Sequence, residues 1–262
     1  MSAELDTLKL ALVQAELRWQ APAENRDHLN ELMDRAPGAD LYLLPETFTT
    51  GFLGDAEREA EPYDGPTFAW LAAQAAARQA AIAGSFATTD EQGLRRNRMV
   101  FMRPDGQASW YDKRHLFSYG GEDQRYTAGS APCVLDWCGW RIDLQICYDL
   151  RFPAWCRNTR DFDLQLFVAN WPSPRVEAWR LLLRARAVEN QAFVAGVNRS
   201  GRDGKGVDYP GRSSAWDGGG ACLVELDGTE TVSVVEMNRQ ALHAFRESLP
   251  FLRDADRFRL EL

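Results

Sequence analysis

The chain has 262 residues, of which 45% are hydrophobic and 11% aromatic, and its formal net charge is -8 at pH 7. A chain of this length and apolar content can bury a large core, which excludes a mainly disordered protein. The acidic balance, with no run of basic residues, argues against a nucleic-acid partner, and no apolar run approaches the roughly 20 residues that a membrane helix needs.

The first residues and the cysteines bear on the compartment. The apolar run at 8–13 follows acidic residues rather than a basic segment, so it does not resemble a signal peptide, and we expect a cytoplasmic protein. Five cysteines, an odd number without a CxxC pair, favour reduced thiols over a disulfide framework. The three histidines lie far apart in the sequence, so we expect neither a metal site nor a cofactor.

Strand-like and helical segments alternate along the chain. Apolar runs predict strands at 8–14, 40–46, 80–87, 95–104, 142–148 and 163–169, and helical periodicity predicts helices at 25–36, 66–80 and 177–191. Asp-Gly pairs at 105–106 and 227–228, each between strand-like runs, predict hairpins, and the glycines at 217–220 predict a tight turn. The pattern indicates an α/β fold with mixed sheets. Without repeats or a linker, a single domain over 1–262 is expected.

Three reactive side chains follow apolar or strand-like runs: Glu46 in LYLLPETF, Lys113 in WYDKRHLF and Cys147 in LQICYDLRFP. Alone, each has an ordinary interpretation, a surface charge or a small buried thiol. Together they are chemically coherent, because a thiol needs a base or a nearby cation to become a nucleophile. Glu46 would accept the proton of Cys147, and Lys113 with the backbone N–H of Tyr148 would stabilise an oxyanion.

Longer stretches around these residues carry a family resemblance. LPETFTTGF, YDKRHLF, CYDLRFP and ARAVENQAFVAGVNRSG resemble the nitrilase, or carbon-nitrogen hydrolase, superfamily, whose members use a Glu-Lys-Cys triad in this chain order. The resemblance covers nearly the whole chain. It implies a four-layer α-β-β-α sandwich with two mixed sheets, commonly a homodimer. It also implies that Glu122, in GGEDQRYTAG, hydrogen-bonds the lysine or the substrate amide.

Within the superfamily, YDKRHLF, CYDLRFP and ANWP resemble the omega-amidase branch. That branch hydrolyses the terminal amide of small 2-oxo-dicarboxylic acid monoamides such as 2-oxoglutaramate and 2-oxosuccinamate, so the implied partner is a small-molecule amide. Arg151 is a candidate for pairing the substrate carboxylate, although it would instead brace the chain if it paired Asp149. Phe117, Tyr119 and Trp171 are expected to form the walls of a small pocket.

Three other interpretations remain open. An N-carbamoyl amide hydrolase or a nitrilase would use the same triad. A Cys-His hydrolase would use His115, which directly follows a Lys-Arg pair and has no supporting Asn or Asp context. An inactive fold serving as a scaffold would hold no reactive thiol. Cys156, near Cys147 but not after a strand, is the cysteine most easily mistaken for a nucleophile.

Overall fold

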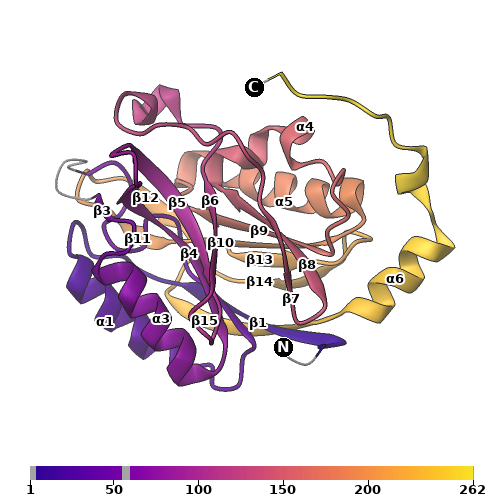
Figure 1. Cartoon of the computed structure of the whole chain (residues 1–262), viewed down its shortest axis with the longest axis horizontal. Coiled ribbons are helices and arrows are strands. Elements are labelled where there is room, and N and C mark those ends of the chain that lie inside the picture. Colours follow the sequence, from indigo (N-terminus) through magenta and orange to yellow (C-terminus); the bar gives the residue numbers. More distant parts are fainter. Residues whose placement is uncertain (1–3, 55–59, 262) are drawn as a thin grey trace.

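A computed structural model describes residues 4–54 and 60–261 (Figure 1). The helices are α1 (Pro22–Met33), α3 (Pro66–Arg78), α4 (Pro153–Cys156), α5 (Val176–Asn190) and α6 (Arg239–Ser248). The strands are β1 (Thr7–Gln14), β2 (Leu41–Leu43), β3 (Glu61–Pro62), β4 (Ala81–Thr89), β5 (Arg95–Met102), β6 (Ala108–Asp112), β7 (Val134–Trp137), β8 (Trp140–Ile146), β9 (Leu164–Ala169), β10 (Phe193–Asn198), β11 (Ser200–Arg202), β12 (Asp208–Pro210), β13 (Ser214–Trp216), β14 (Cys222–Glu225) and β15 (Thr231–Asn238).

Two mixed sheets dominate the part of the chain that the structure describes. The first has the order β15-β1-β2-β4-β5-β6, with β3 paired to β4, and the second has the order β14-β13-β10-β9-β8-β7. Parallel strands β1, β2 and β4 form the centre of the first sheet, and β8, β9 and β10 form the centre of the second. Antiparallel strands flank both centres. A short β11–β12 hairpin stands apart from the sheets.

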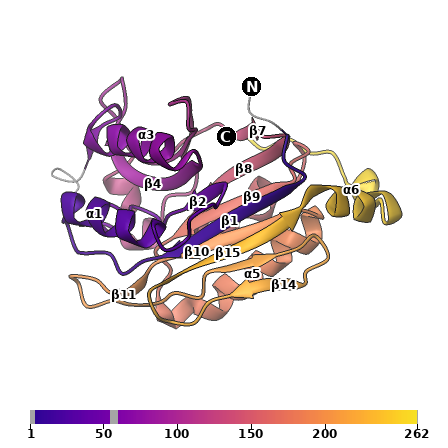
Figure 2. The same ribbon diagram turned by 90° about the horizontal axis from the view of Figure 1, so that it is seen from below.

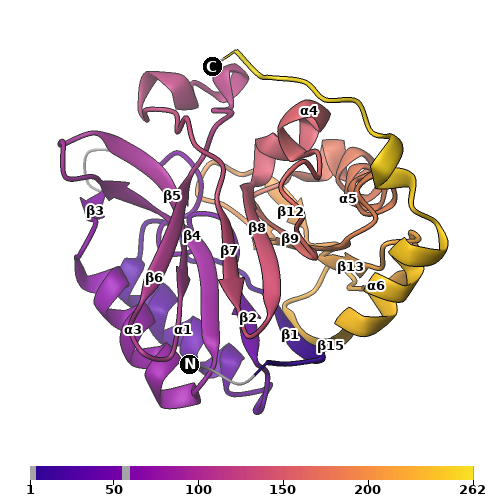
Figure 3. The same ribbon diagram turned by 45° about the vertical axis from the view of Figure 1, so that its right-hand side comes forward.

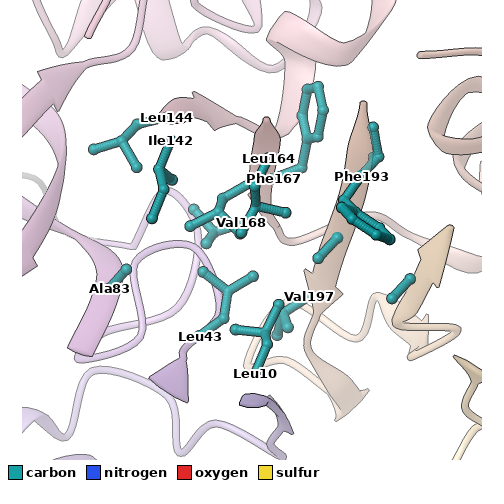
Figure 4. Close-up of a cluster of buried hydrophobic side chains, with 14 of the residues drawn as sticks. Leu10, Leu43, Ala83, Ile142, Leu144, Leu164, Phe167, Val168, Phe193 and Val197 are labelled. Carbon is teal, nitrogen blue, oxygen red and sulfur yellow. The ribbon is translucent and has the colours of Figure 1, made fainter. Parts of the chain in front are cut away.

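Side-chain alternation places the layers. Along β1, Leu10 and Leu12 join the core between the sheets, whereas Ala11 and Val13 join the core under α1 and α3. Figure 4 shows the core between the sheets, where Leu43 and its neighbours from the first sheet meet side chains of β8, β9 and β10. Figure 3 shows α1 and α3 outside one sheet and α5 outside the other. The fold is therefore the predicted α-β-β-α sandwich.

Close packing of α5 on the second sheet depends on a glycine. A Cβ atom at Gly196 in β10 would lie 2.6 Å from Leu183 Cδ1 and 2.7 Å from Trp179 Cζ2. Any larger residue at this position would push α5 away from the sheet. Because α5 begins beside the candidate site, this contact also fixes one wall of that site.

The hairpin predicted around Asp227 and Gly228 is wrong. Both flanking runs are strands, but β14 pairs with β13 and β15 pairs with β1, so the chain crosses from one sheet to the other at this turn (Figure 2). The Gln14 side-chain amide fixes the crossing, since its Nε2 donates to the carbonyls of Asp227 at 2.8 Å and Thr229 at 2.6 Å. The hairpin at 105–106 and the turn at 217–220 are confirmed.

The other predicted segments are confirmed with shifted ends. Two predictions shift by three residues: the helix expected at 25–36 is α1 at Pro22–Met33, and the strand expected at 40–46 is β2, which covers only Leu41–Leu43. Pro45 has no N–H to donate to a strand ladder, so the chain leaves the sheet there and carries Glu46 with it. In the described part of the chain, no helix has the length and apolar character to cross a membrane.

The last segment wraps the second half of the molecule. Arg246 of α6 donates to the Phe162 carbonyl at 2.6 Å and pairs with Asp163 at 3.2 Å. Beyond α6 the chain returns toward α4, where Leu260 and Glu261 line a small cavity with the α4 residues (Figure 1).

Candidate active site

The predicted reactive residues come together at the ends of strands from both sheets. Glu46 and Lys113 follow β2 and β6 of the first sheet. In the second sheet, Cys147 directly follows β8 and Asn170 directly follows β9. Neighbouring parallel strands place their carboxyl ends at one edge, which is where α/β folds collect their sites. The site therefore lies between the two sheets rather than on one of them.

Cys147 occupies a strained turn. It begins the 3-10 turn Cys147–Arg151 directly after β8, and its φ is +45°. A non-glycine residue in the left-handed region costs about 1 to 2 kcal/mol, so surrounding contacts must hold it there. The carboxylate of Asp149 supplies them. It accepts hydrogen bonds from Ile146 N at 3.1 Å, Tyr111 Oη at 2.9 Å, and His115 N at 2.9 Å and Nδ1 at 2.8 Å.

A buried charge cluster lies behind the thiol. Lys113 Nζ is 2.8 Å from Glu46 Oε1 and 2.9 Å from Glu122 Oε2, and all three side chains are completely buried. The Asn97 side-chain amide bridges the carboxylates, donating to Glu46 Oε1 at 2.8 Å and Glu122 Oε1 at 3.1 Å. Asn170 donates its backbone N–H to Glu46 Oε2 at 2.8 Å. Hydrogen bonds at every oxygen offset the cost of removing these charges from water.

The cluster fixes the protonation of its members. Burial raises the pKa of Cys147 well above its ordinary value, and Glu46 and Glu122 raise it further, although Lys113 lowers it. Burial alone lowers the pKa of Lys113, but Glu122, Glu46 and Cys147 outweigh that effect and raise the pKa overall. Burial also raises the pKa of Glu122, and Lys113 opposes this. At neutral pH the site therefore holds a neutral thiol beside a charged ammonium group.

Chemically, a neutral thiol needs a base at the moment of attack, and an ammonium that keeps its proton is an electrostatic stabiliser rather than a base. Tyr148 N–H is the second amide of the 3-10 turn, and the first amides of such a turn have no partner within it. The arrangement suits attack of sulfur on a carbonyl carbon whose oxygen gains negative charge.

Cys147 opens into a cavity of about 200 Å³. This volume is below the roughly 300 to 1,000 Å³ of sites for drug-sized ligands, so the cavity suits a small molecule. Its lining combines aromatic rings with charged and polar groups: Phe52, Leu53, Phe117, Gly120, Cys147, Tyr148, Arg151, Asn170, Trp171, Pro172, Arg175, Asp203, Lys205, Val207 and Tyr209.

The structure differs from expectation at Tyr119. Its side chain is 88% exposed and does not line the cavity, although its ring lies 5.8 Å from that of Phe117. Tyr119 sits on the 3-10 turn Ser118–Gly120, which turns outward after Phe117. Phe117 and Trp171 do line the cavity. The expected pocket wall at Tyr119 was therefore wrong.

Arg151 does not pair with Asp149. The four hydrogen bonds that Asp149 accepts occupy both of its oxygens, two on each. The Arg151 guanidinium instead lies 4.9 Å from the centre of the Trp171 ring and lines the cavity. The brace at this turn is thus made by Tyr111 and His115.

His115 and Cys156 are structural in the geometry observed. His115 bonds Asp149 and stacks on Phe152 with ring centroids 3.7 Å apart, and among the described residues no hydrogen bond or ion pair joins it to Cys147. Cys156 is fully buried behind the turn, with its Sγ 3.2 Å from the Asp149 carbonyl oxygen. The Cys-His interpretation therefore has no geometric support.

Several site residues were missed from the sequence. Asn97 lies inside β5 among arginines and carried no recognisable signal. Asn170 belongs to the ANWP stretch, which was used above only for its resemblance to the omega-amidase branch. Its position, a polar residue directly after an apolar strand, could have indicated a site residue. Arg175 and the β11–β12 residues Asp203, Lys205 and Tyr209 reach the cavity only through tertiary folding.

Comparison with known proteins agrees with this geometry. The carbon-nitrogen hydrolase family model matches residues 9–247. The omega-amidase YafV of Escherichia coli (strain K12) is 42% identical over 254 residues, covering 97% of this chain and 98% of the E. coli protein. The 2-oxoglutaramate amidase of Bacillus subtilis (strain 168) is 32% identical over 251 residues, covering 94% of this chain and 96% of that protein.

A solved structure leads to the same family. XC1258 from Xanthomonas campestris, described as a CN-hydrolase superfamily protein with an arsenic adduct in the active site, superposes with a TM-score of 0.94 at 47% identity. The match covers 97% of this chain and 99% of the Xanthomonas chain. With a family model over most of its length and full-length relatives of this similarity, the chain belongs to the carbon-nitrogen hydrolase family.

Proposed function

We propose that this protein is an omega-amidase that hydrolyses the terminal carboxamide of a small 2-oxo-dicarboxylic acid monoamide, such as 2-oxoglutaramate or 2-oxosuccinamate, to the acid and ammonia. The observation that carries the proposal is the buried Glu46–Lys113–Glu122 cluster directly behind a strained Cys147 that opens into a small cavity. Similarity to an omega-amidase and a 2-oxoglutaramate amidase over nearly the full chain supports the choice of substrate.

The first half of the reaction forms a thioester. Glu46 takes the proton of the Cys147 thiol while sulfur bonds to the amide carbonyl carbon. Negative charge collects on the carbonyl oxygen, where Lys113 and the Tyr148 N–H stabilise it. Glu46 then returns the proton to the nitrogen, the C–N bond breaks, and ammonia leaves.

The second half releases the acid. Glu46 takes a proton from a water molecule, whose oxygen attacks the thioester carbon at the same oxyanion site. When the C–S bond breaks, sulfur recovers the proton from Glu46. Glu122 accepts a hydrogen bond from Lys113, and Asn97 donates to both Glu46 and Glu122. We therefore assign Glu122 and Asn97 the role of holding Lys113 and Glu46 in position and in their charged forms.

Arg151 supplies the first contact for the substrate carboxylate. Its guanidinium lies against Trp171 in the same cavity as Cys147. A planar guanidinium that is held by an aromatic face keeps its N–H groups in a fixed fork, which matches the two oxygens of a carboxylate. Phe117 and Trp171 form apolar walls for the carbon chain between the two ends of the substrate.

Ammonia release from 2-oxoglutaramate and 2-oxosuccinamate tests the proposal. Glutamine, an aliphatic nitrile and an N-carbamoyl amino acid serve as comparison substrates, because an N-carbamoyl hydrolase or a nitrilase would use the same triad. We expect turnover of the oxo-amides, its loss in Cys147→Ala, and its retention in Cys156→Ala, which removes a buried thiol behind the same turn. Turnover of the nitrile or the carbamoyl compound alone would move the protein to the other branch.

Assembly, location and domain organisation complete the proposal. We infer a homodimer formed through the exposed apolar side chains of α5. Leu181 is 68% exposed and Val188 is 50% exposed, and the two residues lie on the same face of the helix, two turns apart. Five free cysteines suit a reducing cytoplasm. One domain over the whole chain fits a core that is shared by both sheets. Sedimentation, cell fractionation and limited proteolysis test these three inferences.

A further inference from the structure

A second arginine enters the cavity from a different element. Arg175 ends the 3-10 turn Ser173–Arg175 and directly precedes α5, whereas Arg151 ends the turn that begins with Cys147. Both arginines line the cavity that contains Cys147. Within residues 4–54 and 60–261, neither guanidinium has a carboxylate partner or a side-chain hydrogen bond.

Aromatic contacts hold Arg175 in place. Its guanidinium carbon is 5.3 Å from the centre of the Phe117 ring, within the range of a cation–π interaction. Phe117 is itself fixed, because its N–H donates to Glu122 Oε2 at 2.7 Å and its ring lies 5.1 Å from that of Tyr148. The Arg175 carbonyl also accepts a hydrogen bond from Trp171 Nε1 at 2.7 Å. Arg175 is therefore tied to the same groups that position the charge cluster.

Among the described residues, the one carboxylate in the cavity lining bonds to groups other than these two arginines. Asp203 is the acidic residue in its lining, and both of its oxygens are occupied. Oδ1 accepts from the N–H groups of Lys205 and Val207 at 2.9 Å, and Oδ2 accepts from Tyr209 Oη at 3.0 Å. Lys205, the third cation of the lining, donates to the Leu53 carbonyl.

Three cationic side chains, Arg151, Arg175 and Lys205, face one carboxylate in the cavity lining, so the cavity carries an excess of positive charge and favours an anion. The protein as a whole carries a net charge of -8, which repels anionic substrates, so a local excess of positive charge is needed to bind one. A carboxylate has about four lone-pair positions, enough for a fork from one arginine and further bonds from a second.

We propose that Arg175 is a specificity-determining residue that, together with Arg151, binds the carboxylate at the end of the substrate remote from the scissile amide. The inference deepens the proposed function and rests on it for the identity of the substrate. Because Arg175 contacts Phe117, the carboxylate is fixed relative to Cys147, and amides that lack an anionic end lose this anchor.

The test compares an anionic and a neutral primary amide in three proteins. The substrates are 2-oxoglutaramate and pentanamide, and the proteins are wild type, Arg175→Gln and the control Arg180→Gln. Arg180 lies on α5, five residues after Arg175. It is outside the cavity and pairs with Glu225 at 2.7 Å. A charged hydrogen-bond pair corresponds to roughly 10- to 100-fold, so we expect kcat/KM for 2-oxoglutaramate to fall by that factor in Arg175→Gln, mainly through KM.

The neutral amide separates binding from folding. We expect kcat/KM for pentanamide to stay within about twofold of wild type in Arg175→Gln, and both substrates to be unaffected in Arg180→Gln. An equal loss for both substrates would make Arg175 a structural residue and overturn the inference. An unchanged preference for the anionic amide would also overturn it, while leaving the proposed function intact.

A binding measurement does not depend on turnover. Glutarate should raise the Tm of the Cys147→Ala protein, and Arg175→Gln in that background should abolish most of the shift. If 2-oxoglutaramate is not a substrate but glutarate still binds through Arg175, the proposed function fails and the anion site stands. If glutarate produces the same shift with and without Arg175, the anion site at this residue is refuted.

Discussion

Asp149→Asn should separate the nucleophile from its supporting turn. The wild-type carboxylate accepts four hydrogen bonds, two on Oδ1 from His115 and two on Oδ2 from Tyr111 and Ile146. An asparagine keeps one acceptor oxygen and turns an NH₂ group toward the other pair of donors. At least two of the four bonds are therefore lost in a fully buried position.

The expected cost follows from the number of bonds. Hydrogen bonds to a charged group contribute about 1.5 to 3 kcal/mol each, so the free energy of unfolding should fall by about 3 to 6 kcal/mol. For a chain of this size that corresponds to a decrease in Tm of roughly 10 to 20 °C. The left-handed backbone at Cys147 loses its support at the same time, and a displacement of the nucleophile near 1 Å can cost about 100-fold in rate.

Thermal unfolding measures the loss of Tm. Steady-state ammonia release measures the loss of rate, and it is assayed at 15 °C, where the variant stays folded. Tyr111→Phe is the comparison variant, because it leaves three of the four donors on Asp149. It also removes the acceptor of Trp155 Nε1 at 3.0 Å and of Arg114 N at 3.1 Å, so it should lower Tm by a similar amount but cost less in rate. A variant with reduced Tm but wild-type kcat would mean that Asp149 stabilises the fold without positioning Cys147. Wild-type values of both would refute the reasoning entirely.

Three further perturbations follow from the same site. Asn170→Ala removes the Nδ2 hydrogen bonds to the Glu46 carbonyl at 2.9 Å, to Glu46 Oε2 at 3.3 Å and to Thr47 Oγ1 at 2.9 Å but keeps the backbone N–H on Oε2. Because the support of Glu46 is weakened, kcat should fall about 10-fold in steady-state assays. Glu122→Gln removes a group that raises the pKa of Cys147, so alkylation by iodoacetamide at pH 8 should accelerate while amide hydrolysis slows; slower alkylation would contradict this. Burial raises the pKa of Cys133 from its ordinary 9.0 to about 11, so its stabilising contribution is complete below pH 9 and declines as the pH rises toward 11, and Cys133→Ala should flatten the fall of Tm over that interval.

The proposed nucleophile and base could be singled out in the sequence because each interrupts a local pattern. Cys147 follows an alternating strand, and Glu46 follows an apolar run that a proline ends. Their partners were less visible. Asn97 is one polar residue among several in β5, and only the tertiary fold shows that its side chain bridges two carboxylates.

Local signals also could not specify which strands pair. The Asp-Gly at 105–106 joins β5 to β6, and the Asp-Gly at 227–228 carries the chain between sheets. Both turns have the same two residues, but the strands flanking the second turn pair with different partners, and Gln14, more than 200 positions away in the sequence, bonds to that turn. In the same way, Arg175 enters the cavity because α5 packs on Gly196, a contact that no periodicity within α5 contains.

Because the site is divided between the two sheets, catalysis depends on how the two sheets pack against each other. The proposed base and the ammonium group belong to one layer and the proposed nucleophile to the other, and the layers meet through side chains such as Leu43, Ile142 and Val168 (Figure 4). A partly folded chain with either sheet formed alone would hold half of the reacting groups. Activity can therefore appear only after the two layers associate, and a substitution deep in the core between them can inactivate the enzyme without touching a residue of its cavity.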